Sequence, residues 1–206
     1  MPGSFLSEVE RDRLIRFPSL IPDEDLIAFF TLSDSDKTEA KKQRGDHNRF
    51  GFALQICTIR YLGFLPQDFS SAPIEAVLFV GEQLHLQVEC LADYGRRFQT
   101  RQDHLKSVLS YLRFRRANPN DWKNLRAWLI ERALEHDKPT LLLEFACEYL
   151  HMNKIIRPGI TRLEGLVIEA RQKTWSKTYM QLESGALPVS PRKFMKLIEK
   201  CEKIAI

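Results

Sequence analysis

The stretch RGDHNRFGFALQICTIRYL, residues 44–62, decides the fold class of this chain. From Asn48 to Leu62 apolar residues fall on nearly every side of a helix, so a helix here has no wide polar face to turn toward water. A helix that is apolar all round is typical of the middle of a bundle, where other helices cover it. Gly45 before the run and Gly63 after it break the helical pattern. The sequence therefore predicts a buried central helix in an all-α protein.

Helical patterns continue on both sides of this stretch, and the alternation of apolar and polar residues that strands show is not convincing anywhere. In a capping box, a Ser or Thr is followed three residues later by an acid, and both satisfy backbone donors at a helix start. Such boxes predict helix starts at Ser7, Ser33, Thr100 and Thr161. Further starts are predicted at Pro73, Asn118 and Pro139. We expect about ten helices with short connections.

The predicted fold is an all-α, multi-helix bundle with two small helix-turn-helix-like units and a C-terminal helical extension. A polar helix over residues 33–43, a turn at Gly45 and the apolar helix match the layout of that motif. We place the first unit at residues 1–87, the second at 88–175, and a linker with a last basic amphipathic helix, Ser190 to Ile204, within 176–206.

The composition indicates an ordinary globular protein, because 44% of the 206 residues are hydrophobic and 28% are charged. No apolar run approaches the roughly 18 residues that a membrane helix needs. The first residues lack the positive start and the apolar stretch of a signal peptide. We therefore expect a cytoplasmic protein that does not enter a membrane.

The residues that usually carry chemistry are dispersed. The four cysteines form no CxxC pair and the five histidines form no HxxxH pair, so a metal site is not indicated. The sequence also lacks a GxSxG elbow, a Walker loop and a GxGxxG motif. Asp46 and His47 are neighbours, but adjacent residues on a helix point in different directions. We predict no catalytic residue, no metal, no cofactor and no small-molecule substrate.

The net charge of +4 conceals a segregation of charge along the chain. Residues 41–60 hold 5 Lys/Arg against 1 acid, net +4, and residues 94–126 hold 9 against 2, net +7. Residues 1–40 hold 4 against 9 and residues 61–93 hold 0 against 5, so each range has a net charge of −5. Compact basic blocks favour a polyanionic partner such as nucleic acid. The alternative is a solvated surface whose charge alternates by chance.

The first basic block places a polar cluster directly before the apolar helix. The backbone N–H groups and the dipole at a helix start favour a phosphate, and the flanking side chains are able to bond phosphates or base edges. The alternative is structural: Asp46 or Asn48 caps the helix and Arg49 pairs with a nearby acid. The candidate DNA contacts in this block are Arg44, His47, Asn48 and Arg49.

The second basic block is YGRRFQTRQDHLKSVLSYLRFRR, residues 94–116. We predict a helix capped by Thr100, with hydrogen-bonding side chains in its first turn and an apolar stripe behind, as a recognition helix requires. A basic surface helix on an ordinary bundle is the alternative. We expect Asn48, Gln99, Gln102 and His104 to face base edges. The candidate contacts in this block are Arg96, Arg97, Gln99, Thr100, Arg101, Gln102, His104, Lys106, Arg113, Arg115 and Arg116.

Five stretches, in order, resemble the N-terminal domain of the Tn-three family of replicative transposases: LSEVERDRLIRFP, IPDEDLIAFFTLSDSD, RGDHNRFGFALQICTIRYLGFLP, YGRRFQTRQDHL and RPGITRLEGLVIEAR. The resemblance covers residues 6–173. It implies a helical region that binds double-stranded DNA at the transposon's terminal inverted repeats. Residues 44–49 would lie in the first DNA-binding unit and residues 96–104 in the second. The family's strand-cutting machinery, with its metal-binding acidic triad, lies in a much larger C-terminal part, so DNA binding without catalysis is implied here.

Two features depart from the family's pattern. Lys37, Thr38 and Glu39 stand where apolar residues are typical, so we expect the first unit to be less stable. The region after Trp175 is shortened, and SPRKFMKLIEKCEKI resembles a segment that lies further on in the family.

A second hypothesis is a protein-interaction module. The basic helix over residues 192–204 would then pair with a second copy, and the chain would act as a homodimerisation piece or as a truncated regulator of the full transposase. The family resemblance implies a bacterial protein of the cytoplasm that is associated with the nucleoid.

Overall fold

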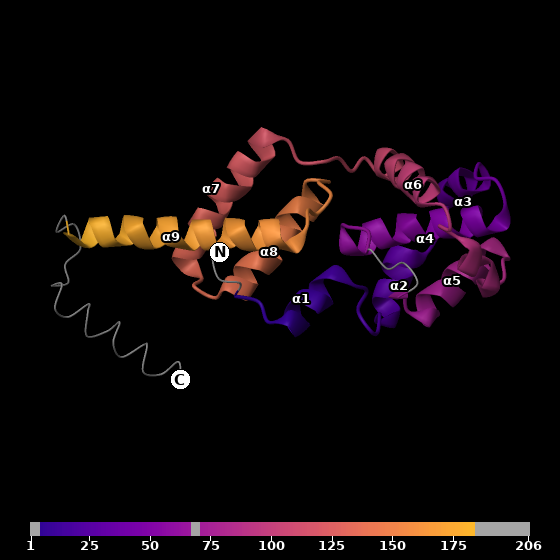
Figure 1. The fold of residues 1–206 in the computed structure, drawn as a ribbon, viewed down its shortest axis with the longest axis horizontal. Helices are drawn as coiled ribbons and strands as arrows, with labels where there is room; N and C mark the ends of the chain where they lie inside the picture. The colour runs from indigo at the N-terminus through magenta and orange to yellow at the C-terminus, as the bar shows by residue number, and fades with distance from the viewer. Residues whose placement is uncertain (1–4, 67–70, 184–206) are drawn as a thin grey trace.

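The computed structural model describes residues 5–66 and 71–183, and Figure 1 shows their arrangement. Within these ranges the chain is helical, with no strand beyond an isolated bridge between Arg115 and Ile155, which confirms the all-α prediction. The elements are α1 Glu8–Ile15, α2 Asp23–Phe30, α3 Asp34–Lys41, α4 Asp46–Leu62, α5 Ile74–Leu84, the 3-10 helix η2 Val88–Asp93, α6 Phe98–Tyr111, α7 Pro119–Glu135, α8 Pro139–Met152 and α9 Ile160–Glu183.

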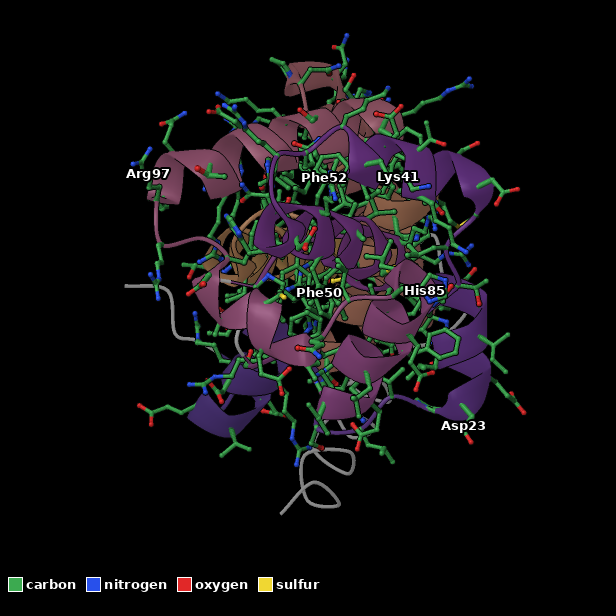
Figure 2. The ribbon with its side chains drawn as sticks, turned by 90° about the vertical axis from the view of Figure 1, so that its right-hand side faces the viewer. Asp23, Lys41, Phe50, Phe52, His85 and Arg97 are labelled. Carbon is green, nitrogen blue, oxygen red and sulfur yellow. The ribbon has the colours of Figure 1, made fainter. Side chains whose placement is uncertain are left out.

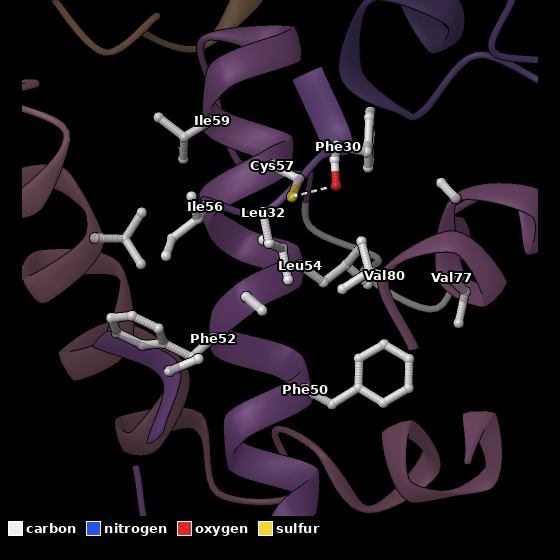
Figure 3. Close-up of a cluster of buried hydrophobic side chains, with 14 of the residues drawn as sticks. Phe30, Leu32, Phe50, Phe52, Leu54, Ile56, Cys57, Ile59, Val77 and Val80 are labelled. Carbon is white, nitrogen blue, oxygen red and sulfur yellow. Dashed lines mark hydrogen bonds between the residues drawn. The ribbon is translucent and has the colours of Figure 1, made fainter. Parts of the chain in front are cut away.

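Helix α4 is buried along ten consecutive residues, Phe50 to Ile59, which confirms the predicted central helix. Helices α2, α3, α5 and α6 and the 3-10 helix η2 all pack against it. Figure 3 shows Phe50 and Phe52 pointing to different sides of α4, with Val77 and Val80 of α5 on the side of Phe50. Burying one large apolar side chain contributes about 1.5–3 kcal/mol, so this helix supplies much of the driving force for the first hydrophobic cluster.

A second hydrophobic cluster lies among α7, α8 and α9. Its buried residues include Leu125 and Leu129 of α7, Leu142 of α8 and Val167 of α9. Leu6, just before α1, joins the same cluster, and α1 itself packs on α9. The N-terminal end of the chain thus covers helices that lie far from it in the sequence.

The boundary between the clusters differs from the boundary predicted at residues 87 and 88. The buried residues of the first cluster run from Phe17 to Phe114, whereas those of the second begin, apart from Leu6, at Leu125. The segment with η2 and α6 therefore packs with α4 and not with α7–α9. The apolar stripe of α6 is compatible with either neighbour, and only its contact with α4 decides between them.

Residues 153–157 join the two clusters. The backbone of Arg115 pairs with this segment, since its N–H donates to Lys154 O and its carbonyl accepts from Ile156 N–H, each at 2.9 Å. Arg157 also reaches the first cluster, because its N–H donates to the carbonyl of Gly63 at 2.9 Å. The guanidinium of Arg157 lies 3.5 Å from the ring centroid of Phe64 and donates to the carbonyl of Leu14.

Three of the predicted helix starts are confirmed in detail, and two capping boxes are wrong. The reciprocal hydrogen bonds of a capping box are present at Ser7, Ser33 and Asn118. Helix α6 instead begins at Phe98 and α9 at Ile160, so Thr100 and Thr161 lie inside their helices. The acids of both boxes have other partners: Asp103 accepts from Gln99 and Lys106, and Glu164 pairs with Arg11 of α1.

The C-terminal part of α9 continues beyond Trp175, where the sequence pattern weakens, and reaches Glu183. Figure 1 shows this end of α9 extending past α7 and α8. The predicted linker at residues 184–188 and the predicted helix from Ser190 to Ile204 lie outside the described residues.

We expect Phe50→Ala to lower the free energy of unfolding by about 3–5 kcal/mol, because it leaves a cavity beside α4. Urea unfolding followed by circular dichroism measures this change. The matched control is Phe98→Ala, whose side chain is 72% exposed, and we expect it to change the free energy by less than about 0.5 kcal/mol. Equal effects of the two substitutions would contradict the central position of α4.

Candidate nucleic-acid interface

Helix α6 presents a polar stripe to solvent. Gln99, Lys106, Ser110 and Arg113 are exposed, and Gln102 is half-buried. Steps of three, four and seven residues place these side chains on one side of the helix, the last of them just past its end. Asp103 lies on the same stripe and accepts hydrogen bonds from Gln99 at 2.9 Å and from Lys106 at 3.2 Å. The stripe therefore carries hydrogen-bonding side chains from the first turn of α6 to its end.

A buried polar network holds the first turns of α6 against α4. The amide nitrogen of Gln55 donates to the hydroxyl of Tyr94 at 2.9 Å and to the carbonyl of Arg101 at 3.4 Å. The same hydroxyl lies 3.0 Å from Nδ1 of His104. Burial raises the pKa of Tyr94 and lowers the pKa of His104, although Asp103 acts to raise the latter. These groups are therefore neutral at pH 7.

The prediction that His104 faces a base edge is wrong in this structure, because its ring is buried. It packs edge-on against Phe52 of α4, with ring centroids 5.3 Å apart, and lies stacked on Tyr94. Histidine is compatible with a surface and with a core, and its neighbours here come from distant parts of the chain. The sequence alone contains no signal that separates the two cases.

Gly51 makes the close approach of Tyr94 to α4 possible. A Cβ atom at position 51 would lie 2.2 Å from Cγ of Tyr94, well inside the closest real contacts. The ring of Tyr94 thus lies directly on the backbone of α4. The bulk of a side chain at this position would displace Tyr94 and with it the start of α6.

A second buried network joins the end of α6 to α3 and α4. The carboxylate of Asp36 is fully buried and accepts hydrogen bonds from Arg60 at 2.5 Å and from Tyr111 at 2.7 Å. The backbone N–H of Ser33 also donates to it at 2.8 Å. Burial acts to raise the pKa of Asp36, but these hydrogen bonds outweigh it, and the pKa lies below the usual value. The negative charge is therefore retained inside the protein.

The two networks show that α4 and α6 run in the same direction. Gln55 meets the first turns of α6, and Arg60, further along α4, shares Asp36 with Tyr111 in the last turn of α6. The N-terminal ends of the two helices thus lie at the same end of the first cluster. The N-terminal parts of the two basic blocks, which the sequence predicted in separate units, lie at this same end.

The polar cluster at the start of α4 is largely bonded to its own turn. The amide of Asn48 donates to the carbonyl of Arg44 at 2.8 Å. Arg49 donates to the carbonyl of Gln43 at 3.2 Å and to Asp46 at 3.1 Å. The ion pair of Arg49 with Asp46 matches the structural alternative, but the predicted cap is wrong, because Gly45 is the N-cap residue of α4 and no side chain caps this helix.

Helices α3 and α4 are joined by a turn, but α4 is not an exposed recognition helix. Gly45 has φ +88°, a conformation that favours glycine, and it precedes the first residue of α4. Only the first turn of α4 reaches the surface, with Asp46 exposed and His47 half-buried. From Phe50 onward the helix is covered by its neighbours.

The remaining predicted contacts divide into two groups. Arg96 pairs with Asp93 at 2.6 Å, and Arg115 makes a two-pronged ion pair with Asp121, which lowers the pKa of that carboxyl to about 2. In the second group, Arg97 and Arg116 are exposed, Thr100 is half-buried in the first turn of α6, and the stem of Arg101 lies across Gly95.

A shallow hollow of about 450 Å³ separates α3 from α6. It is lined by Glu39 of α3 and by Lys106, Ser107, Ser110 and Tyr111 of α6. The exposed Lys41 and Lys42 belong to the end of α3, and Figure 2 shows Lys41 and Arg97 in the upper half of the view. The charge count of residues 41–60 included these lysines, but the site prediction left them out.

Phe98 is the most unexpected side chain at this surface. It is the first residue of α6 and is 72% exposed between Arg97 and Gln99. Sequence reasoning placed it inside the candidate block and did not single it out. The sequence feature that marks Phe98 is an aromatic residue flanked on both sides by hydrogen-bonding side chains.

In residues 5–66 and 71–183, no three His, Cys, Asp or Glu side chains gather as ligands of a metal would. None of the helices in these ranges combines the length and the apolar character that crossing a bilayer requires.

Comparison with known proteins shows a match over most of the chain. Residues 5–170 match the protein family described as a domain of unknown function, DUF4158. The transposase for transposon Tn501 of Pseudomonas aeruginosa is 32% identical over 86% of this chain and 18% of its own length. The transposase for transposon gamma-delta of Escherichia coli (strain K12) is 30% identical over 91% and 19%, and that for transposon Tn1546 of Enterococcus faecium is 32% identical over 77% and 16%. The chain thus spans 16–19% of the length of these relatives.

We expect the stability of the wild-type protein to fall more steeply with acid than that of Asp36→Asn. The pKa of Asp36 is depressed in the folded state, so its contribution is complete at neutral pH and is lost as the pH falls from about 4 through the folded pKa. Urea unfolding at several pH values between 7 and 3 measures the difference. At pH 7 the substitution costs about 1–3 kcal/mol, because the hydrogen bonds of a charged group are weakened.

The control for this experiment is Asp12→Asn, which removes an exposed ion pair with Arg16. We expect a loss of less than about 1 kcal/mol at pH 7. Parallel pH profiles of the wild type and Asp36→Asn would show that Asp36 is not held as an anion.

Proposed function

Because this chain belongs to the DUF4158 family and is homologous over most of its length to Tn-three-family transposases, we propose that it binds the terminal inverted repeats of a transposon as the DNA-binding region of such an enzyme. The relatives are named as transposases. We assign DNA binding to the residues of this chain, which span about a fifth of the length of those relatives.

The single observation that carries this proposal is the polar stripe of α6. The inner side of α6 is bonded to Gln55 of α4 and, through Tyr111, to Asp36 of α3, while Gln99, Gln102 and Lys106 remain on the outer side. A helix with polar side chains in its exposed first turn is suited to the major groove of DNA. Glutamine is able to bond adenine with both ends of its amide, so Gln102 and Gln99 are the proposed base contacts.

The cations around the stripe are proposed to contact phosphates. Arg97 precedes α6 and Arg44 precedes α4, so both lie at the end of the first cluster where these two helices begin. Lys106 lies on the stripe of α6. Lys41 and Lys42 add positive charge at the end of α3. Phosphate contacts set the position of a protein on the duplex, whereas base contacts carry the sequence preference. Double-stranded DNA in the bacterial cytoplasm is therefore the proposed partner.

Binding to a duplex that carries the terminal repeat tests the proposal by fluorescence anisotropy at physiological salt. We expect a preference of about 100-fold over a scrambled duplex, or roughly 3 kcal/mol. If about 6–10 phosphates are contacted, affinity falls by about 10³–10⁵-fold between 50 and 200 mM salt. Equal, weak binding to both duplexes would contradict recognition of transposon ends.

Two substitutions separate base reading from phosphate binding. We expect Gln102→Ala to weaken binding to the repeat by about tenfold, and to change binding to the scrambled duplex little. Lys106→Ala should weaken binding to both duplexes similarly and reduce the salt dependence. Lys123→Ala, an exposed lysine on α7, is the matched control and should leave both affinities unchanged. The same loss in all three variants would argue for a general polyanion surface.

Phe98 offers a further test of the orientation of α6. We expect Phe98→Ala to reduce the preference for the repeat by about tenfold, because an exposed aromatic ring beside Gln99 is placed to contact apolar parts of bases, such as the methyl group of thymine. The melting temperature should not change, since the ring is exposed. Met152→Ala, another exposed apolar side chain on α8, is the control. An unchanged preference in Phe98→Ala would place this end of α6 away from the bases.

A further inference from the structure

The outer side of α5 combines apolar and acidic side chains. Ile74 is 56% exposed and Leu78 is 44% exposed, and Glu75 and Glu82 are exposed as well. Positions 74, 78 and 82 are four residues apart, so they form one stripe along the helix. Neighbouring apolar side chains that remain in water on a folded protein indicate a surface that another molecule covers.

A hollow of about 620 Å³ continues this stripe at the C-terminal end of α5. It forms where the chain turns at His85, which adopts a left-handed conformation with φ +56°, and leads into η2. Apolar and acidic groups again lie together, and the lining includes Leu78, Leu86, Val88, Glu82, Glu89 and His85. The stripe and the hollow together are called the α5 face below.

The charge of the α5 face is negative. Glu75, Glu82 and Glu89 are exposed on it, and residues 61–93 contain no Lys or Arg. The last turn of α5 contains no basic residue, so the negative end of its helix dipole is not balanced locally. Figure 2 shows His85, at the end of α5, on the opposite side of the view from Arg97. This surface therefore fits an apolar partner that also carries several positive charges, and it lies apart from the start of α6.

One segment of this chain has the complementary pattern. In SPRKFMKLIEKCEKI, residues 190–204, apolar side chains recur with helical spacing at Phe194, Leu197, Ile198 and Cys201. The same segment holds 5 Lys/Arg against 2 Glu, net +3. A basic amphipathic helix that lays its apolar side into a groove is a recurring mode of recognition.

Because α9 is long, residues 190–204 of the same molecule lie too far from its α5 face, and the segment on that face comes from another molecule. Helix α9 has 24 residues and is therefore about 36 Å long. It starts beside the junction of the clusters, and Figure 1 shows its far end and α5 at opposite ends of the molecule. Residues 184–189 span at most about 22 Å, so the segment from Ser190 does not reach its own α5 across that length.

We propose that the α5 face binds residues 190–204 of a second copy of this chain. Two copies that exchange these segments form a closed dimer, since each contributes one face and one segment. The contact is partly electrostatic, so added salt weakens it. The α5 face is separate from the stripe of α6, and the dimer does not depend on the proposed DNA binding.

Sedimentation velocity of the full chain, from about 1 to 100 μM, tests the dimer by mass action. We expect the wild type to shift from monomer to dimer as its concentration rises. Leu78→Lys with Glu82→Lys should remain a monomer. The matched control, Leu134→Lys with Glu131→Lys, introduces the same changes at exposed positions of α7 and should associate like the wild type. A wild type that stays monomeric at all concentrations would overturn the proposal.

Charge exchange identifies the segment that occupies the face. Lys196→Glu with Lys200→Glu should weaken association by about tenfold or more, and adding Glu75→Lys with Glu82→Lys to the same chain should restore it. Association that survives the α5 substitutions, or that ignores the charge of residues 196 and 200, would assign the dimer to another surface. Circular dichroism checks that each variant is folded. The α5 variants should retain the affinity for DNA, which keeps this test apart from that of the proposed function.

Discussion

The burial of α4 on every side is the constraint on which the rest of the structure depends. A helix that is apolar all round is stable in water only when other helices surround it. Helices α2, α3, α5 and α6 and the 3-10 helix η2 meet this requirement by packing on the one helix. Each of them consequently has one side against α4 and another side in solvent. The solvent-facing side chains of α3, α5 and α6 differ in charge, so these helices form different surfaces of one cluster.

Two buried polar networks fix the orientation of α6 on its neighbours, in addition to the apolar packing. A buried carboxylate is costly unless charged and neutral donors satisfy it, and Asp36 has Arg60, Tyr111 and the Ser33 backbone as donors. Gln55, with Tyr94, plays the corresponding role at the other end of α6. Apolar contacts alone tolerate a rotation of α6 about its axis. Hydrogen bonds at both ends of α6 do not, so they determine which of its side chains face solvent.

The surfaces around α4 differ in the partner that they fit. Lysines and arginines surround the polar stripe of α6, and this suits a polyanion whose edges carry hydrogen-bonding groups. The α5 face has apolar side chains among acids, and this suits a basic amphipathic helix. The proposed binding of DNA and the proposed binding of a second protein molecule would use these two separate surfaces. The DNA contacts and the dimer are proposals, and the packing that separates their two surfaces is a property of the structure.

The sequence by itself determined the features that depend on neighbouring residues. The all-α class, the buried central helix and the caps at Ser7, Ser33 and Asn118 follow from helical spacing and local hydrogen bonds, and the basic blocks follow from counting charges. The tertiary structure alone decided where distant residues meet. In the folded chain His104 is buried beside Tyr94, and Glu164 pairs with Arg11 and takes no part in a capping box. Helix α6 packs with α4 in one cluster. The physical reason is that a side chain's partner is set by packing between helices, which local spacing does not encode.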